Sequence, residues 1–159
     1  MDEIIPNLWL GNVYEVLHEW HKFDTIITVF HLAELDKFEL DDYKAIKYPN
    51  LINIPILRQN WVWSEPLKDY VCDETWIDPT AMECVAVCIS RALDYNKKKV
   101  LVACSASQER SPLAVIWYLY TYTLGWYTKS LQETFEFVKS KHPQTLDRLS
   151  WLNKLLNNE

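Results

Sequence analysis

Short apolar runs alternate with longer amphipathic segments along this chain of 159 residues. Several of the short runs are rich in β-branched residues, which favours buried strands, and they lie at 8–10, 25–30, 51–56 and 100–104. The segments with helical spacing lie at 12–23, 78–96, 110–123, 130–140 and 146–156, with a shorter candidate at 39–46. Because strands and helices interleave, we predict one layered α/β domain over 1–159, with a central, mostly parallel sheet flanked by helices.

Two of the predicted helices begin at residues that favour helix starts. Asn12 precedes the first helical segment, and its side chain can accept a hydrogen bond from the first turn. Asp78 is a similar cap, and Pro79 after it has the fixed φ that suits a first helical position. These signals place the starts of two helices that flank the sheet.

The most informative stretch follows the apolar run 100–103, which ends at Cys104. Five residues separate this thiol from Arg110, and Ser111 and an apolar helical pattern come next. A strand, a polar loop and a helix in this order suit an oxyanion such as phosphate, because loop N–H groups and the positive end of the helix dipole point at the anion. Arginine can hold two oxygens of the anion at once. The same positive field favours the thiolate of Cys104, which is the nucleophilic form.

A cysteine and an arginine at this spacing also allow a second interpretation. Cys104 can be a half-buried structural thiol at a strand end, with Arg110 in a surface salt bridge. The strand before Cys104 and the helix at Arg110 favour the anion site, because ligands of parallel sheets gather at the carboxyl ends of the strands.

The balance of charge narrows the range of partners. The formal net charge is −6 and the isoelectric point is about 5.2, so we expect no nucleic-acid and no membrane partner. No apolar run approaches the roughly 20 residues of a membrane span. The acidic start at residues 1–3 lacks the apolar segment of a signal peptide. We therefore expect a cytoplasmic protein whose cysteines are reduced.

Two other clusters of candidate ligands favour packing over metal chemistry. Cys84 and Cys88 lie four positions apart on one predicted helix, and we expect both in the core. His18 and His21 share another helix, where a surface or packing role is favoured because a zinc site needs three or four ligands. We therefore expect no metal and no cofactor.

The chain resembles the cysteine-dependent protein tyrosine phosphatases, in particular their small dual-specificity branch. The segments that carry the resemblance occur in the family's order and spacing, and they are 5–12, 52–56, 100–112 and 130–139 with His142 and Pro143. The resemblance implies an α/β fold like that of the dual-specificity phosphatases. It also implies chemistry that needs no metal.

The resemblance assigns a role to each residue of the loop. Cys104 is implied as the nucleophile that forms a cysteinyl-phosphate, and Ser111 as the residue that helps to expel the thiolate. The phosphate is expected to be bound by backbone N–H groups and a guanidinium of the loop residues Ser105, Ala106, Ser107, Gln108, Glu109 and Arg110.

A general acid is expected from the long segment 57–77, which is rich in aromatic and acidic residues. Long connections of this kind are often functional. Asp73 lies near the family's spacing ahead of Cys104 and is our first candidate. Asp78 is the second, although a helix cap is its favoured role, and Asp69 is the third. Asp73 can equally be a solvated loop carboxylate, since an acid must be placed by geometry.

These roles predict a phosphoprotein phosphatase that hydrolyses phosphotyrosine and, if its site is shallow, phosphoserine and phosphothreonine. Two departures from the family's pattern and one added charge support an alternative, a catalytically weak or inactive module that binds phosphorylated partners. Ala103 stands where the family has histidine, Ser107 stands where it has glycine, and Glu109 adds negative charge beside Arg110. A serine is costly if position 107 needs a positive φ. Phosphatases of RNA ends or phosphoinositides are disfavoured by the acidic charge.

Overall fold

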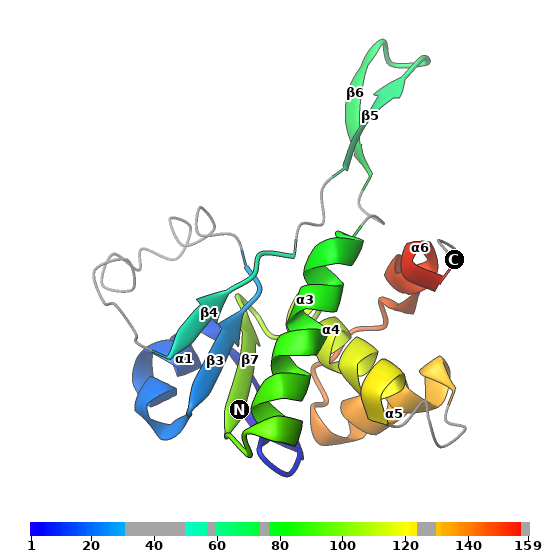
Figure 1. Cartoon of the computed structure of the whole chain (residues 1–159). Helices are drawn as coiled ribbons and strands as arrows, with labels where there is room; N and C mark the ends of the chain where they lie inside the picture. The colour runs from blue at the N-terminus through cyan, green and yellow to red at the C-terminus, as the bar shows by residue number, and fades with distance from the viewer. Residues whose placement is uncertain (31–49, 57–59, 74–76, 124–129, 157–159) are drawn as a thin grey trace.

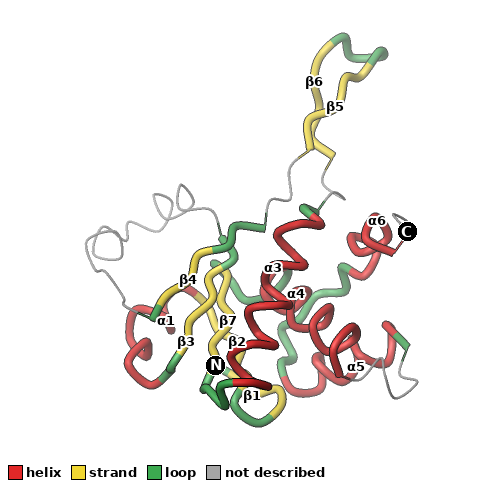
Figure 2. The backbone as a smooth tube through the Cα atoms, viewed as in Figure 1, coloured by secondary structure: helices red, strands yellow, loops and turns green. Residues whose placement is uncertain are grey.

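The computed structural model describes residues 1–30, 50–56, 60–73, 77–123 and 130–156. The described strands form a five-stranded sheet and a separate two-stranded hairpin. In order across the sheet, the strands are β1 (Asp2–Ile5), β2 (Leu8–Asn12), β7 (Val100–Cys104), β3 (Thr25–Thr28) and β4 (Leu51–Asn53). Neighbouring strands from β2 to β4 run parallel, and β1 pairs antiparallel with β2 at one edge. The predicted α/β fold with a mostly parallel sheet is therefore confirmed (Figure 2).

Helices cover the sheet, and most lie within a few residues of the predicted positions. They are α1 (Val13–Glu19), α3 (Pro79–Ser90), α4 (Arg110–Tyr118), α5 (Leu131–Lys141) and the short α6 (Asn153–Leu156). Shorter helical turns extend α1, α3 and α4 and precede α6, and they are η1 (Trp20–Lys22), η3 (Arg91–Tyr95), η4 (Leu119–Thr123) and η6 (Leu149–Leu152). The helix predicted at 39–46 lies outside the described residues. Within the described part, no helix combines the length and the apolar character that crossing a bilayer requires.

The two predicted caps form as their residue types suggest. The Oδ1 atom of Asn12 accepts from the N–H of Glu15 at 2.9 Å, and a carboxylate oxygen of Glu15 accepts from the N–H of Asn12 at 3.0 Å. The Oδ1 atom of Asp78 accepts from the N–H groups of Thr80 and Ala81 at 3.0 and 3.3 Å. These bonds fix where the chain leaves the sheet edge and enters α1, and where α3 begins.

β7 lies in the middle of the sheet and is buried on both faces, with Cys104, at 3%, its most exposed residue. Successive side chains of a strand point to opposite faces, and here they enter two separate hydrophobic clusters. Leu101 and Ala103 pack with residues of α1, whereas Val100, Val102 and Cys104 pack with residues of α3 and α4. Figure 1 shows α1 on one side of the strands and α3, α4 and α5 on the other. A continuous apolar run is what such a doubly covered strand requires.

The aromatic residues of α4 have polar tips that reach α3 and the turn that follows it. Trp117 donates from Nε1 to Glu83 at 2.9 Å, and the Tyr118 hydroxyl donates to Asp94 at 3.3 Å. Burial raises the pKa of the Tyr118 phenol, and the negative charge of Asp94 raises it further. Tyr118 therefore stays a hydrogen-bond donor at neutral pH, and α4 packs without leaving these two donors unpaired.

The last predicted helix, 146–156, is shorter in the structure. Its helical turns begin at Leu149 and continue to Leu156. The N–H of Leu146 donates instead to the carbonyl oxygen of Gln108 at 2.9 Å. Residues 146–148 are thus bound to a distant loop, and the apolar spacing along the segment carries no sign of that contact.

A hairpin occupies most of the described part of the segment 57–77, where we expected a loop. Its strands β5 (Asn60–Ser64) and β6 (Asp69–Asp73) pair antiparallel and project from the body of the chain (Figure 1). Trp63 and Tyr70 are paired across the strands, with ring centroids 5.2 Å apart in an edge-on arrangement. The apolar runs 61–63 and 70–72 on either side of a polar turn are the signal that the loop prediction overlooked.

We expect Asp78→Ala to lower the free energy of unfolding by roughly 1 kcal/mol, because two N–H groups at the start of α3 lose their acceptor. Chemical denaturation followed by tryptophan fluorescence measures the change. Asp69→Ala is the matched control, since Asp69 lies on the exposed hairpin and its replacement is expected to change stability by less than about 0.5 kcal/mol. Equal losses in the two variants would show that the cap contributes nothing of its own.

Candidate functional site

The loop 105–109 joins the carboxyl end of β7 to the amino end of α4, so it lies where ligands of parallel sheets bind. The ends of both neighbouring strands hold it there. The N–H of Val13, just after β2, donates to the carbonyl oxygen of Ser105 at 3.5 Å. The N–H of Val29, just after β3, donates to the carbonyl oxygen of Ala103 at 2.9 Å. The first bond holds the loop itself, and the second holds the end of β7 from which the loop starts.

The sulfur of Cys104 accepts two hydrogen bonds. The N–H of Ser107 donates to Sγ at 3.2 Å, and the hydroxyl of Ser111 donates to it at 3.1 Å. The first bond turns the loop back over the sulfur, and the second comes from the first turn of α4. Donors aimed at a sulfur can stabilise the negative charge that develops on it in a reaction.

Arg110 is half-buried at the start of α4 and faces the beginning of the loop. Its Nη2 atom donates to the hydroxyl oxygen of Ser105 at 3.3 Å. This contact closes the loop, because it joins the residue that follows Cys104 to the residue that begins the helix. The structure therefore places a thiol, a guanidinium, a hydroxyl and the amino end of a helix around one short segment. Such an arrangement can bind a tetrahedral anion and present it to a nucleophile.

Ser107 occupies the left-handed region of backbone conformation, with φ of 56°, and it is fully buried. This is the position where the resemblance leads us to expect glycine. Residues with a Cβ rarely adopt this conformation, and a residue held there typically costs about 1–3 kcal/mol. The conformation persists only where surrounding contacts impose it.

His142 supplies such contacts, although no pattern in the sequence indicates that it lies at the site. It is fully buried, with Nε2 lying 2.7 Å from the carbonyl oxygen of Ser107 and 3.0 Å from its hydroxyl oxygen. Its Nδ1 atom lies 2.6 Å from a carboxylate oxygen of Asp2 on β1. A carbonyl oxygen can only accept, so Nε2 carries a hydrogen and donates to the Ser107 carbonyl, while the contact to Asp2 fixes the orientation of the ring.

Glu109 is paired with a residue that sequence reasoning also missed. Arg148 donates from Nε to a carboxylate oxygen of Glu109 at 3.1 Å. Together with the bond from Leu146 to Gln108, this contact ties the segment 146–148 to the back of the loop. The ion pair offsets the negative charge that Glu109 brings beside Arg110.

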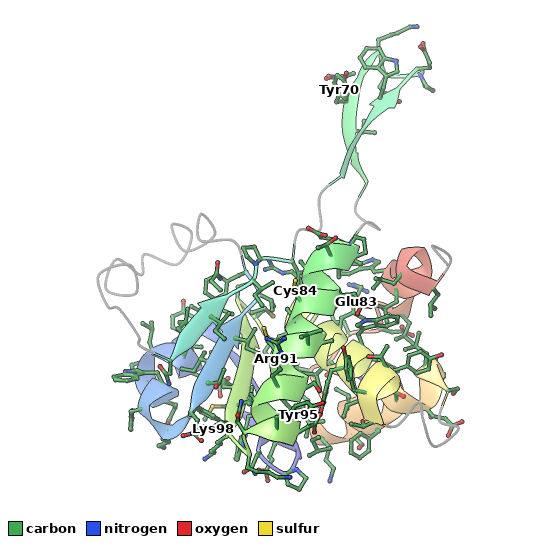
Figure 3. The ribbon with its side chains drawn as sticks, viewed as in Figure 1. Tyr70, Glu83, Cys84, Arg91, Tyr95 and Lys98 are labelled. Carbon is green, nitrogen blue, oxygen red and sulfur yellow. The ribbon has the colours of Figure 1, made fainter. Side chains whose placement is uncertain are left out.

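The three candidate acids lie in different settings. The carboxylate of Asp78 accepts the two N–H groups that it caps. Asp69 is exposed on the hairpin next to Tyr70, which Figure 3 labels on the part of the hairpin that lies away from the body. Asp73 is the last residue of β6, where it is paired with Asn60, and its side chain lies outside the described part of the structure. Asp73 therefore remains the candidate acid as a prediction.

The pair of cysteines on α3 differs from Cys104 in its surroundings. Cys84 is exposed (Figure 3), so its predicted core position is wrong. Cys88 is half-buried and packs against the core. The core face of α3 is formed instead by a set of buried residues that includes Met82, Val85 and Ala86. Burial raises the pKa of the Cys88 thiol, and neighbouring Cys84 raises it further. No group of three or more metal-binding side chains was found among the residues that the structure describes.

Comparison with known proteins finds solved structures that have a similar fold. No family model matches the chain, and no curated protein does. Among solved structures, Tk-PTP in its active form is 18% identical, with a TM-score of 0.67 over 98% of this chain and 92% of that one. The human tyrosine phosphatase-like serine/threonine/tyrosine-interacting protein is 16% identical, with a TM-score of 0.67 over 99% and 94%. Human DUSP28 is 16% identical, with a TM-score of 0.63 over 99% and 91%.

These likenesses show that the chain has the fold of the tyrosine and dual-specificity phosphatases. The resemblance inferred from the sequence is thus confirmed at the level of the fold. A shared fold does not itself establish activity, which depends on the chemistry of the site.

We expect Arg148→Gln to weaken the binding of inorganic phosphate roughly twofold to threefold, because it leaves the charge of Glu109 uncompensated beside the loop. Isothermal titration calorimetry measures the affinity. The double variant Glu109→Gln with Arg148→Gln removes both charges and is expected to recover the loss. If the double variant binds as weakly as Arg148→Gln alone, Arg148 supports the loop by packing and its charge is irrelevant.

Proposed function

We propose that this protein is a phosphoprotein phosphatase that acts on phosphotyrosine, phosphoserine and phosphothreonine through a cysteinyl-phosphate intermediate. The observation that carries the proposal is the sulfur of Cys104, which accepts from Ser107 and Ser111 at the end of the central strand. Arg110 lies against the same loop. A nucleophile, an anion clamp and a leaving-group donor thus meet on eight consecutive positions, 104–111, from the strand into the helix.

The phosphate group is bound by the backbone N–H groups of residues 105–110 and by the guanidinium of Arg110. Charge on the equatorial oxygens must be stabilised during transfer, and fixed N–H groups do this without reorganising. The overall charge of −6 repels phosphorylated substrates, so attraction has to come from this local site. The amino end of α4 adds its dipole to that attraction.

The reaction proceeds in two displacements. The Cys104 thiolate attacks phosphorus, the bond to the substrate oxygen breaks, and Asp73 protonates that oxygen as it leaves. Asp73 then takes a proton from water, whose oxygen attacks phosphorus as the sulfur–phosphorus bond breaks. The departing thiolate is stabilised by the hydroxyl of Ser111, which already donates to it at 3.1 Å. The products are the dephosphorylated side chain and inorganic phosphate, and the reducing cytoplasm is the setting that keeps the thiol available.

A second function has specific support, namely a module that binds phosphorylated proteins without hydrolysing them. Ser107 holds a strained conformation and Ala103 stands where the resemblance leads us to expect histidine, so the loop departs from the family's pattern at two positions. One structural neighbour is itself named a phosphatase-like interacting protein. Both functions use the same anion site, and they differ in whether the sulfur attacks.

We expect the protein to release phosphate from para-nitrophenyl phosphate and from phosphotyrosine peptides, and Cys104→Ser to reduce this release to the background rate. A colorimetric phosphate assay measures both. Cys84→Ser is the matched control, because this exposed thiol on α3 takes no part in the reaction and its loss is expected to leave the rate unchanged.

The same assay separates the two functions. If the unaltered protein releases no phosphate yet binds the phosphopeptide in calorimetry, the binding module is the correct function. Equal release by the unaltered protein and Cys104→Ser would exclude Cys104 as the nucleophile.

A further inference from the structure

The peptide groups on both sides of Ser107 are held by hydrogen bonds. Its N–H donates to the sulfur of Cys104 at 3.2 Å, and its carbonyl oxygen lies 2.7 Å from Nε2 of His142. The directions of these two groups relative to each other are set by φ and ψ of this one residue. A relaxation of Ser107 to negative φ therefore breaks at least one of the two bonds.

The side chain of Ser107 adds a third contact in the same place. Its hydroxyl is buried and lies 3.0 Å from Nε2 of His142. A buried hydroxyl without a partner is costly, so the imidazole also satisfies the group that distinguishes serine from glycine here. Glycine adopts φ of 56° freely, whereas serine at this position needs an external group to hold it.

His142 is itself rigidly placed by two other elements. It ends α5, where its N–H donates to the carbonyl oxygen of Val138 at 2.8 Å. Its own carbonyl oxygen accepts from the hydroxyl of Thr145 at 2.7 Å, and its ring is bound through Nδ1 to Asp2 on β1. The imidazole is thus held in place by α5 and β1, which lie outside the loop that it contacts.

We propose that His142, oriented by Asp2, is a positioning residue that holds Ser107 in the left-handed conformation and so keeps its N–H aimed at the sulfur and the anion loop closed. It acts through Ser107 and touches neither the sulfur nor the substrate. Its contribution to anion binding rests on the proposed function, because the loop it shapes is the proposed phosphate site. Ser107 and His142 form one unit, because the contacts of His142 offset the free-energy cost of the left-handed conformation of Ser107.

A double-mutant cycle with orthovanadate as the probe tests this unit. The variants are His142→Ala, Ser107→Gly and the two combined, and calorimetry measures vanadate affinity for each. With serine at 107, we expect His142→Ala to weaken binding roughly 5-fold to 30-fold, which corresponds to losing control over one left-handed residue. With glycine at 107, the same replacement is expected to weaken binding less than twofold.

A purely structural role for His142 would give a different pattern. It would weaken binding equally in both backgrounds, and that result would overturn the proposal. Unchanged vanadate affinity in His142→Ala would overturn it as well. His142→Gln provides a conservative check, because its side-chain amide can still donate to the Ser107 carbonyl, and we expect it to retain more affinity than His142→Ala. A glutamine variant as weak as the alanine variant would count against the proposed bond.

A readout that needs no anion separates this inference from the proposed function. The backbone amide resonance of Ser107 in a nitrogen-15 NMR spectrum reports its conformation directly. We expect it to shift in His142→Ala and to return toward the unaltered position in His142→Gln. If the folded protein binds no vanadate but the resonance behaves in this way, the proposed function fails and the positioning role stands. If vanadate binds normally and the resonance does not move in His142→Ala, the positioning role fails alone.

Discussion

The hydrogen bond from the N–H of Ser107 to the sulfur of Cys104, 3.2 Å long, determines the shape of the whole loop. The bond spans a reversal of the chain within three residues of the end of β7, and it requires the positive φ of Ser107 that the contacts of His142 support. The same turn directs the Ser107 carbonyl toward His142 and brings Arg110 back against Ser105. A thiol that merely filled the core would need none of these contacts.

The net negative charge of the protein explains why charge-balancing contacts surround this loop. A protein with a net charge of −6 can attract a phosphorylated partner only where positive potential is concentrated. In the proposed function, Arg110, the amino end of α4 and the loop N–H groups provide that concentration. The negative charge of Glu109 lowers this positive potential, and the ion pair with Arg148 offsets that charge. Arg148 belongs to the segment 146–148, which contacts the loop and is not helical. The C-terminal part of the chain therefore serves the electrostatics of the site as well as the core.

The sequence predicted those features that depend on neighbouring positions. The buried strand 100–104 follows from its apolar run, the start of α3 from Asp78, and the loop from the spacing of Cys104 and Arg110. What it could not predict are contacts between distant positions. Asp2 and His142 lie 140 positions apart, and Arg148 and Glu109 lie 39 apart, so no local pattern links them. The hairpin lies where we expected a loop for a different reason, because its apolar runs of three residues are too short to distinguish a strand from an aromatic loop.

Both proposed functions require that the segment between Cys104 and Arg110 form a closed bowl that binds a tetrahedral anion. A crystal structure of the protein soaked in sodium tungstate tests it most directly. We predict tungstate beside the Cys104 sulfur, with its oxygens about 3 Å from the N–H groups of residues 105–110 and from the Arg110 guanidinium. A loop that is splayed open, with the sulfur packed into the core and no anion beside it, would contradict the account.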